Sequence, residues 1–222
     1  MKITNDTPAE YSISEIFMPD IVHARFCVFD MEGTGMDTVN DRIIQIGAVI
    51  VENGKINPSR KFESLVNPGI TVPPQIERFT GIKNERLLDA PGFGAVYERF
   101  RQFIGDDKTI LIAHCGFEYD FSLLQQECKR AGLEYFVNPK LDTKVMFANL
   151  YPERKETFST DFLLLYYRIQ SDDVTRHTAA GDSILTGRIL ENILNDYKIL
   201  GISHFKLVGS RRILKFIPQV LK

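Results

Sequence analysis

The chain has 222 residues, of which 44% are hydrophobic and 25% are charged. This composition is typical of a globular protein, and the length is sufficient for one sizeable core in a single domain. A net charge of −2 excludes a basic surface overall, so any attraction to nucleic acid must be local or depend on metal ions.

The cysteines and the N-terminus indicate the compartment. The cysteines are Cys27, Cys115 and Cys128, an odd number without a C-x-x-C pair, which favours reduced thiols over disulfides or a zinc site. The N-terminal segment lacks the apolar stretch that follows the basic residues of a signal peptide, so we do not expect one here. No run approaches the ~18 apolar residues of a membrane span. We therefore expect a cytoplasmic protein without a membrane partner.

The first elements predicted are strands. Residues 1–21 are polar and patternless, and we expect a loose lead-in before a domain at 22–197. Apolar or alternating segments predict strands at 26–30, 43–51 and 60–66, with the Asn-Gly pair of "ENGK" suited to a hairpin turn. The domain therefore opens as an antiparallel meander.

Helices then alternate with a further strand. Helical spacing of apolar residues and capping residues predict a short helix between Pro74 and Gly81, helices at 92–105, 120–131 and 182–197, and one capped by Ser159, Thr160 or Asp161. The apolar segment 109–114 predicts a buried strand. This order indicates an α/β fold with a mixed sheet covered by helices.

The last segment, 198–222, has a different charge. It holds six basic residues and no acidic one. Since the whole chain has a net charge of −2, residues 1–197 carry a net charge of −8. We favour an extension that packs its apolar residues on the domain, and contact with nucleic acid or a partner protein is the alternative.

Two carboxylates lie at the end of the first predicted strand. Asp30 and Glu32 are two positions apart, so in an extended segment both side chains point to the same side. Such a pair repels itself unless a cation neutralises it, and Mg²⁺ or Mn²⁺ prefers oxygen ligands. The alternative is a solvated pair in a loop.

Two later segments add polar groups. Asp120 opens a predicted helix, where an acid also suits the helix dipole. His177 lies just before the last predicted helix, and Asp182 lies in its first turns. A histidine beside carboxylates is a candidate general base, whereas a lone histidine is more often structural.

Together the three segments resemble the DEDDh 3′–5′ exonucleases, the DnaQ-like family related to the proofreading subunit of bacterial DNA polymerase III. The resemblance extends over residues 22–197. It rests on three motifs. Asp30, Glu32, Thr34 and Gly35 match the family's D-x-E-x-T-G motif, and Ala113, His114 and Asp120 match its A-H pair followed by an acid. His177 and Asp182 match its H-x(4)-D motif.

The second motif departs from the family pattern. Cys115 stands where the family commonly has Asn, and the gap from His114 to the acid is one residue longer than usual. Glu118 is therefore a rival for Asp120. We favour Asp120 because it begins an amphipathic helix, as the acid of the family does.

The resemblance implies a ribonuclease H-like fold and phosphodiester hydrolysis with two Mg²⁺ or Mn²⁺ ions. Asp30 would bridge both ions, Glu32 and Asp182 would hold the one that carries the attacking water, and Asp120 would support the other. His177 would accept the proton of the water.

The implied substrate is the 3′ end of single-stranded DNA or RNA. The resemblance places Thr34, Gly35, Met36, His114 and Phe117 beside the terminal nucleotides. It also implies a possible polymerase or other replication or repair partner. A non-catalytic nucleic-acid-binding or polymerase-associated module on the same fold remains the alternative.

Overall fold

The computed structural model describes residues 1–216 and is built around a five-stranded sheet of order β6-β5-β4-β7-β8. β4 (Phe26–Gly33), β5 (Ile43–Glu52) and β6 (Lys55–Leu65) form an antiparallel meander. β7 (Ile110–Ala113) and β8 (Lys140–Asp142) continue the sheet in parallel with β4. The predicted mixed sheet, an antiparallel meander followed by parallel strands, is confirmed.

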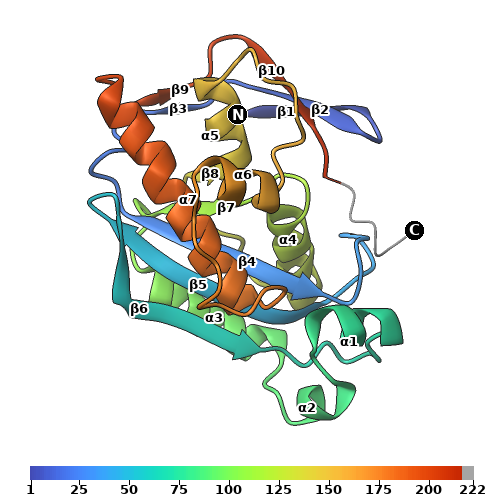
Figure 1. Cartoon of the computed structure of the whole chain (residues 1–222). Coiled ribbons are helices and arrows are strands. Elements are labelled where there is room, and N and C mark those ends of the chain that lie inside the picture. The colour runs from blue at the N-terminus through green and yellow to red at the C-terminus, as the bar shows by residue number, and fades with distance from the viewer. Residues whose placement is uncertain (217–222) are drawn as a thin grey trace.

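Helices cover both faces of this sheet (Figure 1). α5 (Thr143–Leu150), α6 (Thr160–Tyr166) and α7 (Ala179–Ile199) pack on one face, where Val28 and Val49 contribute to the core. α3 (Phe93–Ile104) and α4 (Asp120–Ala131) pack on the other, where Cys27 and Phe29 contribute. Because alternate residues of β4 enter opposite cores, the strand is buried on both sides, which explains its continuous apolar run.

Short helices occupy the connection between β6 and α3. α1 (Pro74–Thr80) starts after Pro73 and ends at Gly81, whose φ of 71° is the left-handed conformation that terminates many helices. α2 (Asn84–Leu88) follows at once. The sequence did not predict α2, β8 or α5, because segments of three to eight residues contain too few apolar positions to display a period.

The prediction of a loose lead-in at 1–21 is wrong. β1 (Lys2–Thr7) and β2 (Glu10–Ser14) form a hairpin, and β10 (Ser210–Leu214) pairs with β2 to complete a second, three-stranded sheet. We call β1, β2 and β10 the terminal sheet. The buried side chains of β2, Tyr11 and Ile13, alternate with polar residues and join the core beneath α5 and α7.

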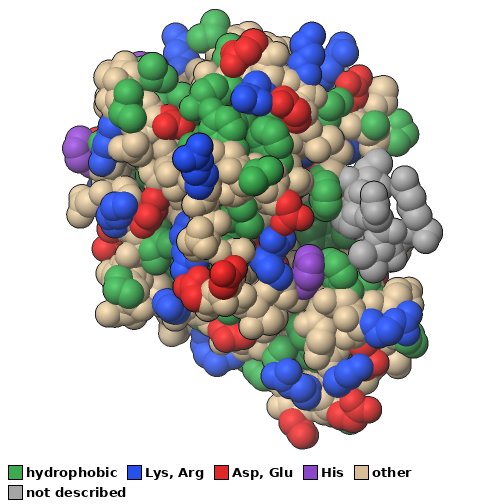
Figure 2. Space-filling model, viewed as in Figure 1, with side chains coloured by type: hydrophobic (Ala, Val, Ile, Leu, Met, Phe, Trp, Pro, Cys, Tyr) green, Lys and Arg blue, Asp and Glu red, His purple; other side chains and the backbone are tan. Residues whose placement is uncertain are grey.

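The C-terminal segment packs on the domain as far as the structure describes it. β9 (Phe205–Lys206) pairs with β3 (Phe17–Met18), and Phe205, Leu207 and Ile213 are buried in the same core. The end of the predicted basic extension, 217–222, lies outside the described residues. Figure 2 shows basic and acidic side chains interspersed on one face of the molecule, consistent with the small net charge.

No helix in residues 1–216 is long and apolar enough to cross a membrane. Cys27, Cys115 and Cys128 are free thiols, so the prediction of unpaired cysteines agrees with the structure. Cys27 and Cys128 are buried and contribute to the core beneath α3 and α4 as small apolar side chains.

Candidate active site

The last residues of β4 include the first two acids. Asp30 and Glu32 belong to the strand itself, which continues to Gly33, three residues beyond the predicted end at 30. Met31 between them is buried in the core beneath α3 and α4. The two carboxylates therefore leave the strand on the opposite side, as the period of two predicts.

The start of α7 brings Asp182 to this edge of β4. Thr178 caps the helix through its hydroxyl, which accepts a hydrogen bond from the Gly181 amide. The Ala179 amide donates to Gln45 Oε1 on β5 at 3.0 Å. Gln45 lies opposite Glu32 in the strand ladder, so β5 holds the helix directly beside the acids.

Gly47 makes this close approach possible. It lies opposite Asp30 in the ladder, and a Cβ at Gly47 would lie only 2.1 to 2.3 Å from backbone atoms of Ala179 and Ala180. Any side chain at this position would push the start of α7, and with it Asp182, away from the strand. The sequence analysis did not identify Gly47 or Gln45, although a single glycine inside a β-branched strand is a known signal of close backbone contact.

Three carboxylates meet at this point. One oxygen each of Asp30, Glu32 and Asp182 lies within 4.8 Å of the others, and we call these residues the acid cluster. In residues 1–216, no other group of three His, Cys, Asp or Glu side chains comes as close together. Oxygen donors with a combined charge of up to −3 fit a hard divalent cation such as Mg²⁺ or Mn²⁺.

Asp120 lies next to the cluster without belonging to it. Its side chain is buried at the start of α4, and Oδ1 accepts a hydrogen bond from the Met31 amide at 3.0 Å. Its charge is one of the two largest influences on Asp30 after burial. All four predicted acids therefore come from three separate segments to the C-terminal end of β4, the central strand of the sheet.

The electrostatics show that these acids resist ionisation. Burial, followed by the charges of Asp120 and Asp182, raises the pKa of Asp30 well above its usual range. Burial, followed by Asp182 and Asp120, raises the pKa of Glu32 to about 8. Burial also raises the pKa of Asp120 to about 7. Without a cation, the site retains protons near neutral pH, and a divalent cation would compensate the same charges.

His177 lies beside Asp182 but contacts it through the backbone. Its amide donates to Asp182 Oδ2 at 2.8 Å, while its exposed ring lies 4.3 Å from the ring of Phe79 in α1, measured between centroids. The φ of 58° at His177 is in the left-handed region, so the chain turns sharply before α7. The predicted position of His177, in the loop before the helix, agrees with this arrangement.

Glu118 and Asp120 have different environments. Glu118 Oε1 forms an ion pair of 2.7 Å with Lys144, whose side chain is fully buried, and Glu118 itself is only 8% exposed. Its other oxygen accepts a hydrogen bond from the Phe216 amide at 2.9 Å. Glu118 is thus engaged by groups outside the acid cluster, whereas Asp120 contacts the strand that carries two members of the cluster.

The departure at Cys115 has a structural counterpart. Cys115 has a φ of 59°, in the left-handed region that asparagine adopts more readily than most residues. The family's usual Asn therefore suits the turn that follows β7. The turn forms with Cys115 as well, and it delivers Asp120 to the start of α4.

The residues after the first motif form a tight loop. Thr34 is buried, and its hydroxyl donates to Asp41 Oδ1 at 2.7 Å. The Gly35 carbonyl accepts a hydrogen bond from the Tyr119 hydroxyl at 2.7 Å, while Met36 is 45% exposed. Of the three residues predicted to contact substrate here, only Met36 presents a large surface to solvent, and Tyr119 is a neighbour that the sequence analysis did not identify.

His114 is buried and neutral. Its Nδ1 lies 2.8 Å from Thr143 Oγ1, and its Nε2 has no hydrogen-bond partner within the described residues. Burial, followed by the charge of Lys144, lowers the pKa of His114 to about 3. The unpaired Nε2 is itself buried, so the ring presents no free nitrogen at the surface.

Phe117 lies within the protein rather than on an open surface. Its ring is 5.2 Å from that of Phe121, and it packs against both hydrophobic cores. Its amide also donates to the buried carboxylate of Asp142 at 3.2 Å. This packing favours a role in the core over the stacking role predicted for it.

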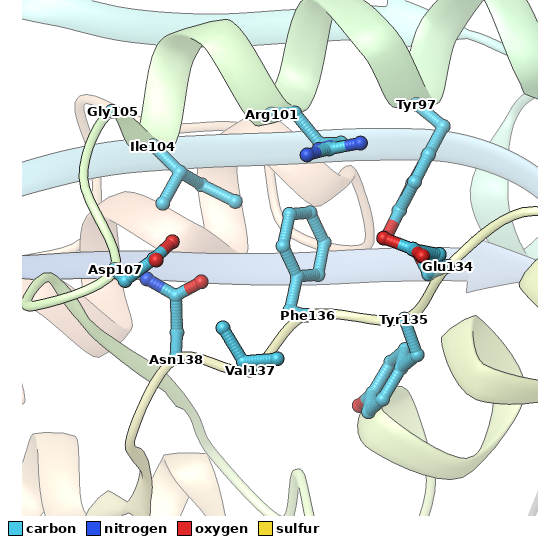
Figure 3. Close-up of a pocket in the computed structure, with 10 residues that line it drawn as sticks. All are labelled: Tyr97, Arg101, Ile104, Gly105, Asp107, Glu134, Tyr135, Phe136, Val137 and Asn138. Carbon is cyan, nitrogen blue, oxygen red and sulfur yellow. The ribbon is translucent and has the colours of Figure 1, made fainter.

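A separate pocket of about 210 Å³ lies on the α3 side of the sheet. Figure 3 shows Arg101 and Ile104 of α3 facing Phe136 and Asn138 in the segment before β8. None of the four predicted acids lines this pocket. The acid cluster therefore remains the candidate site.

Comparison with known families identifies the class of protein. A profile described as "Exonuclease" (RNase_T) matches residues 27–190, which include all four acids and His177. The chain belongs to this exonuclease family. The resemblance to DnaQ-like DEDDh exonucleases inferred from the sequence is thereby confirmed.

Particular relatives belong to DNA polymerase III. The chain is 32% identical over 189 residues to a "DNA polymerase III PolC-type" from Caldanaerobacter subterraneus subsp. tengcongensis, an alignment that covers 85% of this chain and 13% of the relative. It is 31% identical over 177 residues to the "DNA polymerase III subunit epsilon" of Aquifex aeolicus, with 80% of this chain and 84% of the relative covered. The chain thus spans only a small part of the PolC-type relatives.

The fold also matches solved nucleases. The nuclease domain of 3'hExo, described as a DEDDh family member bound to rAMP, superposes with a TM-score of 0.69 at 20% identity. The match covers 80% of this chain and 94% of that domain. At this identity the comparison establishes the shared fold.

Proposed function

We propose that this protein is a metal-dependent 3′–5′ exonuclease that removes nucleotides from the 3′ end of single-stranded DNA or RNA. The observation that carries the proposal is the meeting of Asp30, Glu32 and Asp182 from two distant segments within 4.8 Å. Family membership over residues 27–190 supports the same activity. A chance group of acids would have no reason to be partly buried against its own electrostatic repulsion.

The acids would hold two divalent cations. Asp30, Glu32 and Asp182 supply converging oxygens, and Asp120 lies beside Asp30 at the start of α4. When bound, two such ions activate a water and stabilise both the attacking and the leaving oxygen of an in-line displacement. Asp120 is preferred over Glu118 as the fourth ligand because Glu118 is already paired with the buried Lys144.

His177 is the proposed general base. It lies one residue before the Thr178 cap of α7, and its backbone is tied to Asp182 by the 2.8 Å hydrogen bond. Its exposed ring lies against Phe79 and is held by no other side chain among the contacts described. A neutral imidazole in this position can accept a proton from water as the phosphodiester bond is cleaved.

The pathway part of the proposal rests on the relatives. The names of the relatives place them in DNA polymerase III, so we propose a polymerase or another replication or repair protein as the partner. The 3′-end substrate would contact the loop at Thr34, Gly35 and Met36, and His114 directly after β7.

The test is digestion of matched DNA and RNA oligonucleotides labelled at the 5′ end, with Mg²⁺, with Mn²⁺ and with a chelator. A ladder that shortens from the 3′ end and requires the metal is expected. Asp30→Asn and Asp182→Asn should abolish it. Asp172→Asn, which removes the same charge from an exposed position, is the control and should leave the rate unchanged.

Two results would contradict the proposal. Internal cleavage or release from the 5′ end would reject the polarity. Binding of the oligonucleotide without hydrolysis at any metal concentration would favour the non-catalytic module on the same fold.

A further inference from the structure

Arg176 forms an ion pair with a member of the acid cluster. Its Nε lies 2.8 Å from Asp182 Oδ1, and its Nη1 lies 2.7 Å from Asp161 Oδ1. The other oxygen of Asp182 accepts the His177 amide. Both oxygens of Asp182 are therefore engaged in the structure, one of them by a cation that belongs to the chain itself.

This arginine is distinctive in its position. Among the lysines and arginines of residues 1–216, it alone forms an ion pair with Asp30, Glu32, Asp120 or Asp182. Its side chain is 29% exposed, so it is partly accessible to solvent beside the cluster. The sequence analysis did not identify it, because an arginine that precedes a histidine has no pattern of its own.

The two partners of Arg176 hold it unequally. Asp161 is 80% exposed, and ion pairs at exposed positions contribute little. Asp182 is 15% exposed and lies among other carboxylates, so its attraction for the guanidinium is stronger. A cation bound by Asp182 would compete for the same oxygen, and Arg176 would then retain only its weak partner.

A freed guanidinium at this point would face the substrate. The planar, always charged guanidinium matches a phosphate group with two parallel hydrogen bonds. The chain has a net charge of −2, so positive groups near the path of a nucleic acid strand must be local. Arg176 satisfies this requirement at the edge of the cluster.

We propose that Arg176 is a substrate-binding residue that exchanges Asp182 for a phosphate of the nucleic acid strand. In the free protein it pairs with Asp182 and limits the affinity of the cluster for cations. When Asp182 serves as a cation ligand, Arg176 turns to the phosphate. This inference rests on the proposed exonuclease function, and it adds one residue and its role in recognising the strand.

A purely structural role predicts the opposite effect on metal affinity. If Arg176 only holds Asp182 in the orientation that binds metal, its removal should weaken metal binding. If Arg176 competes with the metal for Asp182, its removal should strengthen metal binding. The direction of the change therefore separates the two roles, independently of any rate measurement.

The experiment compares Arg176→Gln, Arg176→Lys and the control Arg188→Gln. Arg188 forms a similar ion pair with Asp173, which is no part of the cluster, so the control removes the same charge and the same kind of contact. Calorimetric titration with Mn²⁺ alone measures metal affinity. Initial rates on a single-stranded oligonucleotide give KM and kcat at several salt concentrations.

For Arg176→Gln we expect Mn²⁺ affinity to rise about threefold to tenfold, in line with the removal of one nearby positive charge. KM should rise about tenfold, with a smaller change in kcat, and the dependence of log KM on log salt should weaken by about 0.7, the amount for one contact to a single strand. Arg176→Lys should fall between Arg176→Gln and the wild type, and Arg188→Gln should match the wild type.

Reduced Mn²⁺ affinity in Arg176→Gln, or an unchanged KM and salt dependence, would overturn the inference. Either result leaves the proposed exonuclease function intact if the wild type digests the oligonucleotide. Failure of the wild type to hydrolyse it in Mg²⁺ or Mn²⁺ would instead reject the proposed function itself. Thermal melting of each variant confirms that the comparison is between folded proteins.

Discussion

The raised pKa of Glu32 makes a quantitative prediction about stability. The pKa rises from 4.5 to about 8 when the chain folds, so the folded state keeps a proton that the unfolded chain loses. The stability contributed by this proton is fully present below pH 4.5 and is lost as the pH rises through 8. Between these values the protein without metal becomes progressively less stable because Glu32 must ionise inside the site.

The size of the effect follows from the size of the pKa change. One pKa unit corresponds to about 1.4 kcal/mol, so a rise from 4.5 to about 8 corresponds to at most about 5 kcal/mol. Glu32 is only partly buried, and solvent screening reduces the effect, so we expect on the order of 1–3 kcal/mol.

Glu32→Gln removes this titration. In metal-free buffer, the free energy of unfolding of Glu32→Gln relative to wild type should increase by about 1–3 kcal/mol between pH 5 and pH 9. In saturating Mg²⁺ the order should reverse, because the wild type binds the metal more tightly and gains more stability from it. Urea denaturation at both pH values, with and without metal, measures these differences.

A matched variant tests the reasoning. Glu98 is exposed on α3, and Glu98→Gln should show the same pH dependence as wild type. A difference between Glu32→Gln and wild type that does not change with pH would refute the assignment of a raised pKa. Equal stabilisation of Glu32→Gln and the wild type by Mg²⁺ would refute Glu32 as a metal ligand.

The remaining predictions concern the supports of the site and the base. Gly47→Ala should destabilise the protein by about 1–3 kcal/mol and reduce activity, because the added methyl group would displace the start of α7. Gly94→Ala, whose Cβ would lie in open space, should change neither stability nor activity, and equal activity of the two variants would contradict the argument. Glu118→Gln should lower the free energy of unfolding by about 3–5 kcal/mol, because it leaves the buried Lys144 unpaired, whereas Asp120→Asn should abolish hydrolysis in a folded protein. If thermal melting and hydrolysis rates show the reverse pattern, Glu118 is the ligand. His177→Gln should slow hydrolysis about 10²–10⁴-fold without loss of the fold, and an unchanged rate would show that the histidine is structural.

Much of the main domain could be predicted from local patterns. The β-branched run of β5 and the apolar run of β4 predicted their strands, because both strands are buried on two sides and their sequences show it. The two-residue spacing of Asp30 and Glu32 was enough to place both carboxylates on one side. The start of the last predicted helix likewise placed His177 in the loop before α7.

Other features depended on partners far along the chain. The terminal sheet joins β2 to β10, about 200 residues later, and neither strand is apolar enough to be recognised alone. Glu118 was a plausible ligand in the sequence, and only the structure shows its ion pair with the buried Lys144.

The sequence by itself predicted which acids could form the site, with Asp120 and Glu118 as alternatives, because strand periodicity and motif spacing are local properties. Only the tertiary structure decided how the acids meet. Gly47 lets α7 lie against β5, and Arg176 reaches Asp182 across the turn before the helix. The first contact depends on how closely two segments more than 100 residues apart approach each other, and the second depends on the path of the turn before α7. Backbone packing in the folded protein sets the approach of the segments and the path of the turn.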